Sequence, residues 1–223
     1  MDRNELEKIR IEKIERMRAG GVEPYPTRSE ITHTTLEAAR QFEAAEQSGA
    51  GPIQVTVGGR LRSSRLMGKL AFAHIEDGSG RLQLFLRVNE LGEEALEHFK
   101  NDFDLGDFIQ ASGPLVRTRT GEISVQVQGF KMLAKAITPL PAAKDELVDG
   151  QVVRHAALTD AETRYRQRYA DLAVNPEVRE VFRARAKTTK ALREFLDGLG
   201  FLEVETPILQ PIYGGAAAKP FVT

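Results

Sequence analysis

Hydrophobic residues recur at helical spacing in the first part of the chain, with charged residues of both signs around them. This pattern predicts a helix over residues 2–19. Four aliphatic side chains share one face of it: Leu6, Ile9, Ile14 and Met17. A second, shorter helix is predicted over residues 34–48, and the Gly- and Pro-containing stretch 48–52 ends it. We therefore expect an N-terminal helical extension over residues 1–52.

From Ile53 onward, apolar and polar residues alternate, which is typical of strands with one buried face. The first strand is interrupted by Gly58-Gly59, and this pair predicts a bulge where the strand bends sharply. Residues 70–75 and 82–86 are predicted to form a hairpin. Its turn is Asp77-Gly78-Ser79-Gly80, in which Asp and Gly tolerate the positive φ that a tight turn requires.

The following residues predict one helix and two further strands. Asn89 is expected to cap a helix that runs to about Lys100. Strands are predicted over residues 108–116 and 122–130. Three strands, a helix and two strands is the order of an OB-fold, a closed five-stranded β-barrel. The sequence therefore predicts an OB-fold over residues 53–133.

The last third of the chain returns to helical spacing. Residues 134–158 have no clear period and are predicted to be a linker. Residues 160–173 are predicted to be helical, and Asn175-Pro176 is expected to open a long helix, with Asn as the cap and Pro in the first turn. Gly200 is expected to end that helix, and residues 201–204 to form a short strand.

Composition excludes several classes of protein. The formal net charge is −1, so any nucleic-acid-binding surface must be a local one. The absence of cysteine excludes disulfides and thiolate metal sites and suits a reducing cytoplasm. The four histidines lack metal-ligand spacing, so we expect no metal site. No apolar run approaches the roughly 18 residues of a membrane span, so we expect no membrane partner.

The predicted barrel carries residues suited to single-stranded RNA, since an OB-fold binds it around strands two and three, where bases stack on aromatic rings. Alternation places Ala71, Ala73 and Ile75 inside the barrel. Phe72 then points outward, although a lone strand phenylalanine is more often a core residue. Gln83 on the next strand is positioned to hydrogen-bond the edge of a stacked base. Basic candidates for phosphate contacts precede these residues: Arg60, Arg62, Arg65 and Lys69.

Residues 200–209, Gly-Phe-Leu-Glu-Val-Glu-Thr-Pro-Ile-Leu, resemble motif 1 of class II aminoacyl-tRNA synthetases. Four other stretches resemble bacterial lysyl-tRNA synthetases and occur in the order that they have in that family: residues 65–69, 135–141, 164–172 and 214–221. Aspartate or asparagine specificity on the same architecture is an alternative, but the last two stretches weigh against it. Relative to that family, residues 145–154 look like an insertion, and Lys219 replaces an arginine.

The resemblance implies roles for particular residues. In the lysyl, aspartyl and asparaginyl enzymes, an OB-fold phenylalanine stacks on the central anticodon uridine, matched here by Phe72. A glutamine that reads the uridine edge is matched by Gln83, and an assisting arginine by Arg65. A glutamate on the connection between the last two strands corresponds to Glu122. Motif 1 implies a dimer interface at Gly200, Phe201, Val204 and Pro207, and the loop after it implies lysine-pocket residues Gly214, Gly215 and Ala216.

The resemblance further implies a lysine–tRNA ligase, which activates lysine with ATP and Mg²⁺, transfers it to tRNA(Lys) and acts as a homodimer. Motifs 2 and 3, whose arginines hold ATP in this class, do not occur before Thr223. We therefore expect a fragment that ends just after motif 1, carries no catalytic residue and is inactive alone. The alternative is a non-catalytic tRNA- or single-stranded-RNA-binding OB-fold module. The expected fold class is α+β, with the start of an antiparallel α/β catalytic domain over residues 159–223.

Overall fold

The computed structural model describes residues 4–141, 144–148, 151–155 and 158–207. Contacts divide the chain into two units, Met1–Leu140 and Pro141–Thr223, which are described separately below. The finer division expected from the sequence, with boundaries after residues 52, 133 and 158, stays a prediction.

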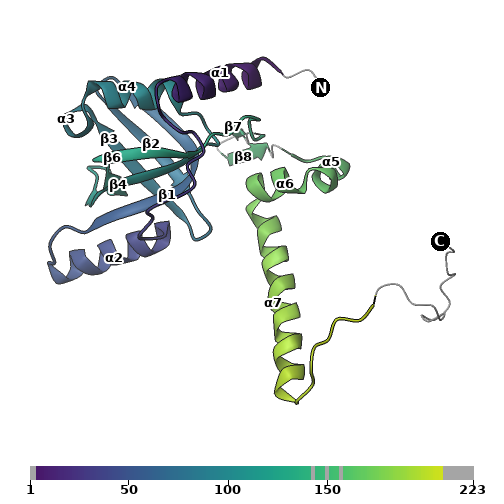
Figure 1. Cartoon of the computed structure of the whole chain (residues 1–223). Coiled ribbons are helices and arrows are strands. Elements are labelled where there is room, and N and C mark those ends of the chain that lie inside the picture. Colours follow the sequence, from purple (N-terminus) through teal and green to yellow (C-terminus); the bar gives the residue numbers. More distant parts are fainter. Residues whose placement is uncertain (1–3, 142–143, 149–150, 156–157, 208–223) are drawn as a thin grey trace. The chain divides into compact units, whose positions relative to one another are not determined.

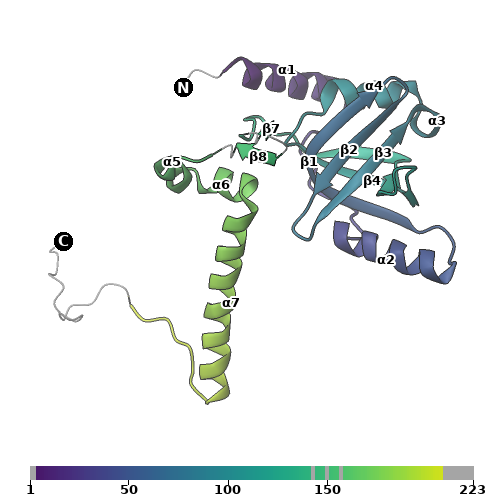
Figure 2. The same cartoon turned by 180° about the vertical axis from the view of Figure 1, so that it is seen from behind.

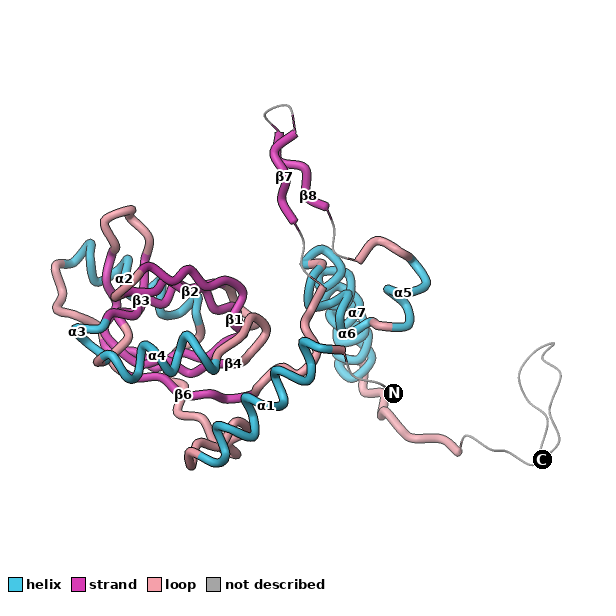
Figure 3. Tube along the Cα trace, turned by 90° about the horizontal axis from the view of Figure 1, so that it is seen from above, coloured by secondary structure: helices cyan, strands magenta, loops and turns pink. Residues whose placement is uncertain are grey.

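The first unit is built around a sheet that closes on itself. Its strands are β1 (Gln54–Met67), β2 (Leu70–Glu76), β3 (Arg81–Arg87), β4 (Phe108–Arg117), β5 (Ile123–Gln126) and β6 (Gly129–Ala134). The strand order is β1-β2-β3-β5-β4-β6, and β1 also pairs with β4, so five strands form a ring (Figure 3). All pairs are antiparallel except β3 with β5. This topology confirms the predicted OB-fold.

Alternating side chains fill the ring. Ala71, Ala73 and Ile75 on β2 have 0% exposure, whereas Phe72 and His74 between them are partly exposed. The sequence analysis predicted from the aliphatic residues which side chains of β2 point into the ring, and this prediction is confirmed. The same interior continues into the neighbouring strands with Val57, Leu84, Leu86, Ile109, Ala111 and Val125. Burial of these apolar groups is the main term that stabilises the ring.

The bend in β1 does not lie where the sequence predicted it. The first half of β1 pairs with β4 and the second half with β2, and the register shifts between Leu61 and Ser63. The prediction of a bulge at Gly58-Gly59 was therefore wrong. Gly59 instead permits a close approach of two strands, since a Cβ atom there would lie 2.9 Å from the carbonyl oxygen of Glu76.

Two N-terminal helices, α1 (Glu5–Ala19) and α2 (Thr35–Ser48), confirm the predicted ones. Thr34 and Glu37 form a capping box at the start of α2. The interior of the ring is closed at one end by α2 and at the other by α4 (Glu93–Asp102), as Figures 1 and 2 show. Ala38 of α2 and Phe99 of α4 belong to the buried core.

Two predicted elements are interrupted in the structure. The helix expected from Asn89 to Lys100 is split into α3 (Val88–Leu91) and α4, because Gly92 between them adopts a φ of +85°. Asn89 thus lies inside α3, and its predicted role as a cap was wrong. The strand expected over residues 122–130 is split into β5 and β6, which pair with successive parts of one edge of β4.

The second unit begins with a hairpin of β7 (Lys144–Val148) and β8 (Gln151–His155), which the expectation of an aperiodic linker missed. The predicted helix over residues 160–173 is divided into α5 (Ala161–Arg166) and α6 (Arg168–Val174). The long helix α7 (Pro176–Gly198) begins at the predicted proline. The prediction of a strand over residues 201–204 was wrong, since this segment has no regular structure and no described strand pairs with it.

Candidate nucleic-acid interface

Two rows of side chains cross the outer face of the ring from β1 to β5. Their members are set by cross-strand pairing: Arg65, Phe72, Phe85 and Gln126 in the first row, and Ser63, His74, Gln83 and Ser124 in the second. Directly paired residues on one face of a sheet have neighbouring side chains. The structure therefore brings three of the predicted site residues, Arg65, Phe72 and Gln83, onto one surface.

The first row contains a stacked aromatic pair. The rings of Phe72 and Phe85 are parallel within 2°, with their centroids 4.7 Å apart. This distance equals the usual spacing between neighbouring strands, so the rings stand on the sheet and stack along the row. The guanidinium of Arg87 lies 5.6 Å from the Phe85 centroid. Arg65, across from Phe72, is exposed and makes no hydrogen bond or ion pair with any described residue.

The second row is joined by hydrogen bonds that converge on Glu122. The two oxygens of this carboxylate accept from His74 Nε2 at 2.8 Å and from Gln83 Nε2 at 2.5 Å. Ser124 Oγ donates to Gln83 Oε1 at 2.7 Å. Ser63 Oγ lies 2.9 Å from His74 Nδ1. Gln83 is therefore held at both ends of its amide, and Glu122 joins the other three predicted anticodon-binding residues on this surface.

Glu122 lies just before β5, in a turn that α2 helps to hold. Arg117 NH1 donates to the carbonyl oxygen of Gly121 at 2.8 Å, and Arg117 Nε donates to Glu46 of α2 at 2.9 Å. The hydrogen bond that Arg117 donates to Glu46 raises the pKa of Arg117 and lowers the pKa of Glu46. The turn that carries Glu122 is thereby tied to α2.

The predicted phosphate-contact residues differ in their availability. Arg60 is half-buried, with its guanidinium 4.5 Å from the Phe108 ring centroid, and burial lowers its pKa. Arg62 pairs with Glu76 at 3.4 Å. Lys69, like Arg65, is exposed. Two of the four basic side chains are thus engaged within the unit, while two face solvent.

Sequence reasoning missed Phe85 as a member of this surface and gave His74, which alternation places on the same face as Phe72, no role in it. The signal was present in the turn Asp77–Gly80, because a four-residue turn fixes the register of the two strands that it joins. In that register Phe72 pairs with Phe85, and His74 pairs with Gln83. The hairpin was predicted, but its register was not followed to these pairs.

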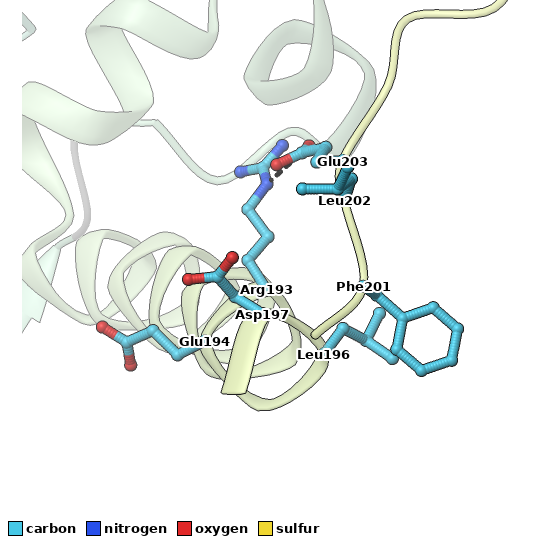
Figure 4. A pocket seen from close by; sticks show the side chains of 7 residues that line it. All are labelled: Arg193, Glu194, Leu196, Asp197, Phe201, Leu202 and Glu203. Atoms are coloured by element: carbon cyan, nitrogen blue, oxygen red, sulfur yellow. Dashed lines mark hydrogen bonds and ion pairs between the residues drawn. The ribbon is translucent and has the colours of Figure 1, made fainter. Parts of the chain in front are cut away.

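The second unit carries the residues that the sequence likened to motif 1. Gly200 follows α7 with a φ of +85°, and the side chains after it are largely exposed, at 61% for Phe201 and 71% for Val204. Figure 4 shows Phe201 beside Leu196 at the end of α7, in a pocket lined by Arg193, Glu194, Leu196, Asp197, Phe201, Leu202 and Glu203. Pro207 is the last described residue of this segment.

Several predicted features fall outside the described residues. They are the lysine-pocket residues Gly214, Gly215 and Ala216 and the substituted Lys219. Among the residues with described structure, no group of three or more His, Cys, Asp or Glu side chains could hold a metal ion. No helix in the described ranges is long and apolar enough to cross a membrane.

Two family models of known proteins match separate parts of the chain. Residues 55–133 match the family model of an OB-fold nucleic acid binding domain named for the tRNA anticodon. Residues 160–223 match the model of class II tRNA synthetases (D, K and N). Both matches lie where the sequence analysis expected an OB-fold and the start of a synthetase domain.

Curated relatives are similar to the chain along its whole length. A lysine–tRNA ligase of Roseiflexus castenholzii is 50% identical over 224 residues, which cover 100% of this chain and 43% of the relative. Those of Pelotomaculum thermopropionicum and Clostridium tetani are 47% and 43% identical, over 100% and 99% of this chain and 40% and 41% of the relatives. The chain thus spans about two fifths of the length of the curated relatives that it matches.

Proposed function

We infer the function of this chain from the premise that it belongs to the family of lysine–tRNA ligases, which are class II aminoacyl-tRNA synthetases. We propose that its OB-fold unit binds the anticodon loop of tRNA(Lys) through the outer face of β1, β2 and β3. The observation that carries this proposal is the row of exposed Arg65 and partly exposed Phe72 and Phe85 beside the Gln83–Glu122 pair.

Base stacking is the first part of the proposed recognition. One face of the Phe72 ring is covered by Phe85, so a nucleobase stacks on the other face, on the side of Arg65. Base–aromatic stacking is worth about 1–3 kcal/mol per base. The guanidinium of Arg65, free of other described partners, can then lie over the base or contact a neighbouring phosphate.

Reading of the base edge is the second part. A carboxylate accepts hydrogen bonds only, whereas the amide nitrogen of glutamine donates. Glu122 and Gln83 together therefore suit a base edge with a donor beside an acceptor, as uracil presents with its N3–H and carbonyl oxygens. Cytosine has an acceptor at N3 and its donor at the exocyclic N4 amino group, so a carboxylate placed opposite N3 would meet no proton there. The chemistry of the pair thus supports uridine as the base that stacks on Phe72.

The remaining expectations concern a protein of the relatives' full length. We propose that such a protein activates lysine with ATP and Mg²⁺, transfers it to tRNA(Lys) in the cytoplasm, and dimerises through the region of α7 and Gly200–Pro207. The exposed apolar side chains of α7, among them Leu192, Phe195 and Leu196, support an interface there. The described residues offer no cluster of carboxylates for Mg²⁺, so we assign no catalytic step to them.

The stacking role is tested with Phe72→Ala. We expect it to weaken binding of an RNA stem–loop with the anticodon UUU by about 1–3 kcal/mol, because the base loses its platform. Isothermal titration of the 223-residue chain measures this affinity. Phe195→Ala, an exposed phenylalanine on α7, is the matched control and should leave binding unchanged.

A second RNA, with an abasic site in place of the central uridine, checks that the effect acts through that base. Phe72→Ala should make little difference to its affinity. Equal affinity of the wild-type chain and Phe72→Ala for the UUU stem–loop would refute the stacking assignment. Failure of the wild-type chain to prefer this RNA over an unrelated hairpin would instead favour the non-catalytic, unspecific RNA-binding module.

A further inference from the structure

His74 lies in the second row, next to the proposed base-reading pair, and no role in recognition follows from the resemblance. Its Nε2 atom is 2.8 Å from Glu122 Oε1, and its Nδ1 atom is 2.9 Å from Ser63 Oγ. The side chain of His74 is 28% exposed and that of Glu122 is 46% exposed. The contact between them is therefore at the surface, where it contributes little to packing.

We propose that His74 is a positioning residue, which holds the Glu122 carboxylate in place to accept the imino proton of the bound base. This inference rests on the proposed function of the surface and deepens it. His74 acts through Glu122 and does not itself contact the base.

The hydrogen bonds of Glu122 explain why its carboxylate needs a positioning residue. Its carboxylate is bound by two described side chains, His74 and Gln83. When Gln83 Nε2 turns to donate to a base, the contact between Gln83 and Glu122 weakens or breaks. His74 then remains as the side chain that fixes the carboxylate. Without it, a half-exposed glutamate would have to lose its rotamer freedom on binding, and that loss would lower the affinity.

Ser63 fixes the orientation of the imidazole. Because the Glu122 carboxylate can only accept, His74 Nε2 must be the donor in their hydrogen bond. In the neutral imidazole Nδ1 is then an acceptor, which suits the hydroxyl of Ser63 as donor. The chain from Ser63 through His74 to Glu122 therefore aims a hydrogen-bond donor at one carboxylate oxygen and leaves the other oxygen to Gln83 or to the base.

Three substitutions of His74 separate this role from a purely structural one. His74→Ala removes the ring and the donor, and His74→Phe keeps a ring without the donor. His74→Gln restores a donor, since its Nε2 lies the same number of bonds from Cα as the histidine Nε2. We expect the first two variants to bind the UUU stem–loop about three- to tenfold more weakly, and His74→Gln to bind within about twofold of wild type.

The effect must also depend on Glu122 and on the base. In a double-mutant cycle, His74→Ala should have no further effect in the Glu122→Ala background, since its only route to the RNA is removed. It should also have little effect on an RNA with the anticodon UCU, because cytosine offers no imino proton. His33→Ala, a histidine bonded to Gln41 away from this surface, is the control and should match wild type.

The inference is overturned if His74→Ala binds UUU as tightly as wild type, or if it weakens binding equally with and without Glu122. An equal loss for His74→Gln and His74→Ala, with unchanged melting temperatures, would also overturn it. The proposed function fails separately, if wild type shows no preference for UUU over UCU and Phe72→Ala has no effect. A preference for UUU that needs Phe72 and Glu122 but not His74 would refute the inference alone.

Discussion

At the scale of single residues, Lys135 joins several parts of the first unit. Its side chain is fully buried, and its ammonium donates to the backbone oxygen of Asp102 and to Asp107 Oδ2, each at 2.7 Å. It also pairs with Asp104, which accepts from Lys13 of α1 at 2.8 Å. Burial by itself raises the pKa of Asp104, but the hydrogen bonds from Lys13 and Lys135 outweigh it and lower that pKa.

Lys135→Met should therefore destabilise the first unit strongly. The substitution leaves the fully buried Asp107 carboxylate without its ammonium partner, and breaking a buried ion pair typically costs about 3–5 kcal/mol. Urea unfolding followed by circular dichroism measures the loss. Lys131→Met, whose partner Glu30 is exposed, is the matched control and should cost no more than about 1 kcal/mol. Equal losses for both variants would contradict this account of the buried cluster.

The candidate site was predictable one residue at a time, but the contacts between its residues were not. The outward position of Phe72 followed from Ala71, Ala73 and Ile75, because alternation on a strand is a local property. Its partner Phe85 depends on the register between two strands. The hydrogen bonds of Glu122 depend on the path of a turn that is distant in sequence. Neither the register between the two strands nor the path of this turn can be predicted from local sequence patterns.

At the scale of elements, predictions were confirmed where signals were local and wrong where an element depends on a partner. The capping box at Thr34 and the proline at residue 176 mark helix starts through their own backbone chemistry. The strand expected at residues 201–204 needs a neighbouring strand, and none pairs with it among the described residues. The break between α3 and α4 arises from Gly92, whose positive φ the helical spacing does not reveal.

The passage of β4 between β1 and β5 depends on Gly113. A Cβ atom at this position would lie 2.0 Å from the backbone oxygen of Gln126. We expect Gly113→Ala to destabilise the ring by about 2–3 kcal/mol, since backbone atoms must shift to relieve the overlap. Thermal unfolding checks this, with Gly51→Ala as the control, because a Cβ atom there meets nothing within 4 Å. An unchanged melting temperature for Gly113→Ala would disprove the required close approach.

At the scale of the whole molecule, the chain combines two units with different proposed tasks. The first presents the surface that we propose reads the anticodon, and the second carries a long helix with an exposed apolar face. The similarity to lysine–tRNA ligases and the OB-fold were predictable because several short signatures occur in order along the chain. The comparisons find the same similarity and a match to an OB-fold model. The split into units, by contrast, follows from three-dimensional contacts, and the hairpin of β7 and β8 left no clear period in the sequence.

The central claim is that a uridine stacks on the ring of Phe72. NMR spectroscopy of a stem–loop RNA that is isotope-labelled at its central anticodon uridine tests it most directly. On binding to the chain, the H5 and H6 resonances of that uridine should move upfield, as expected for protons above an aromatic ring, and should show nuclear Overhauser contacts to the Phe72 ring. Phe72→Ala should abolish both. A bound RNA whose central uridine shows neither the shift nor the contact would contradict the account.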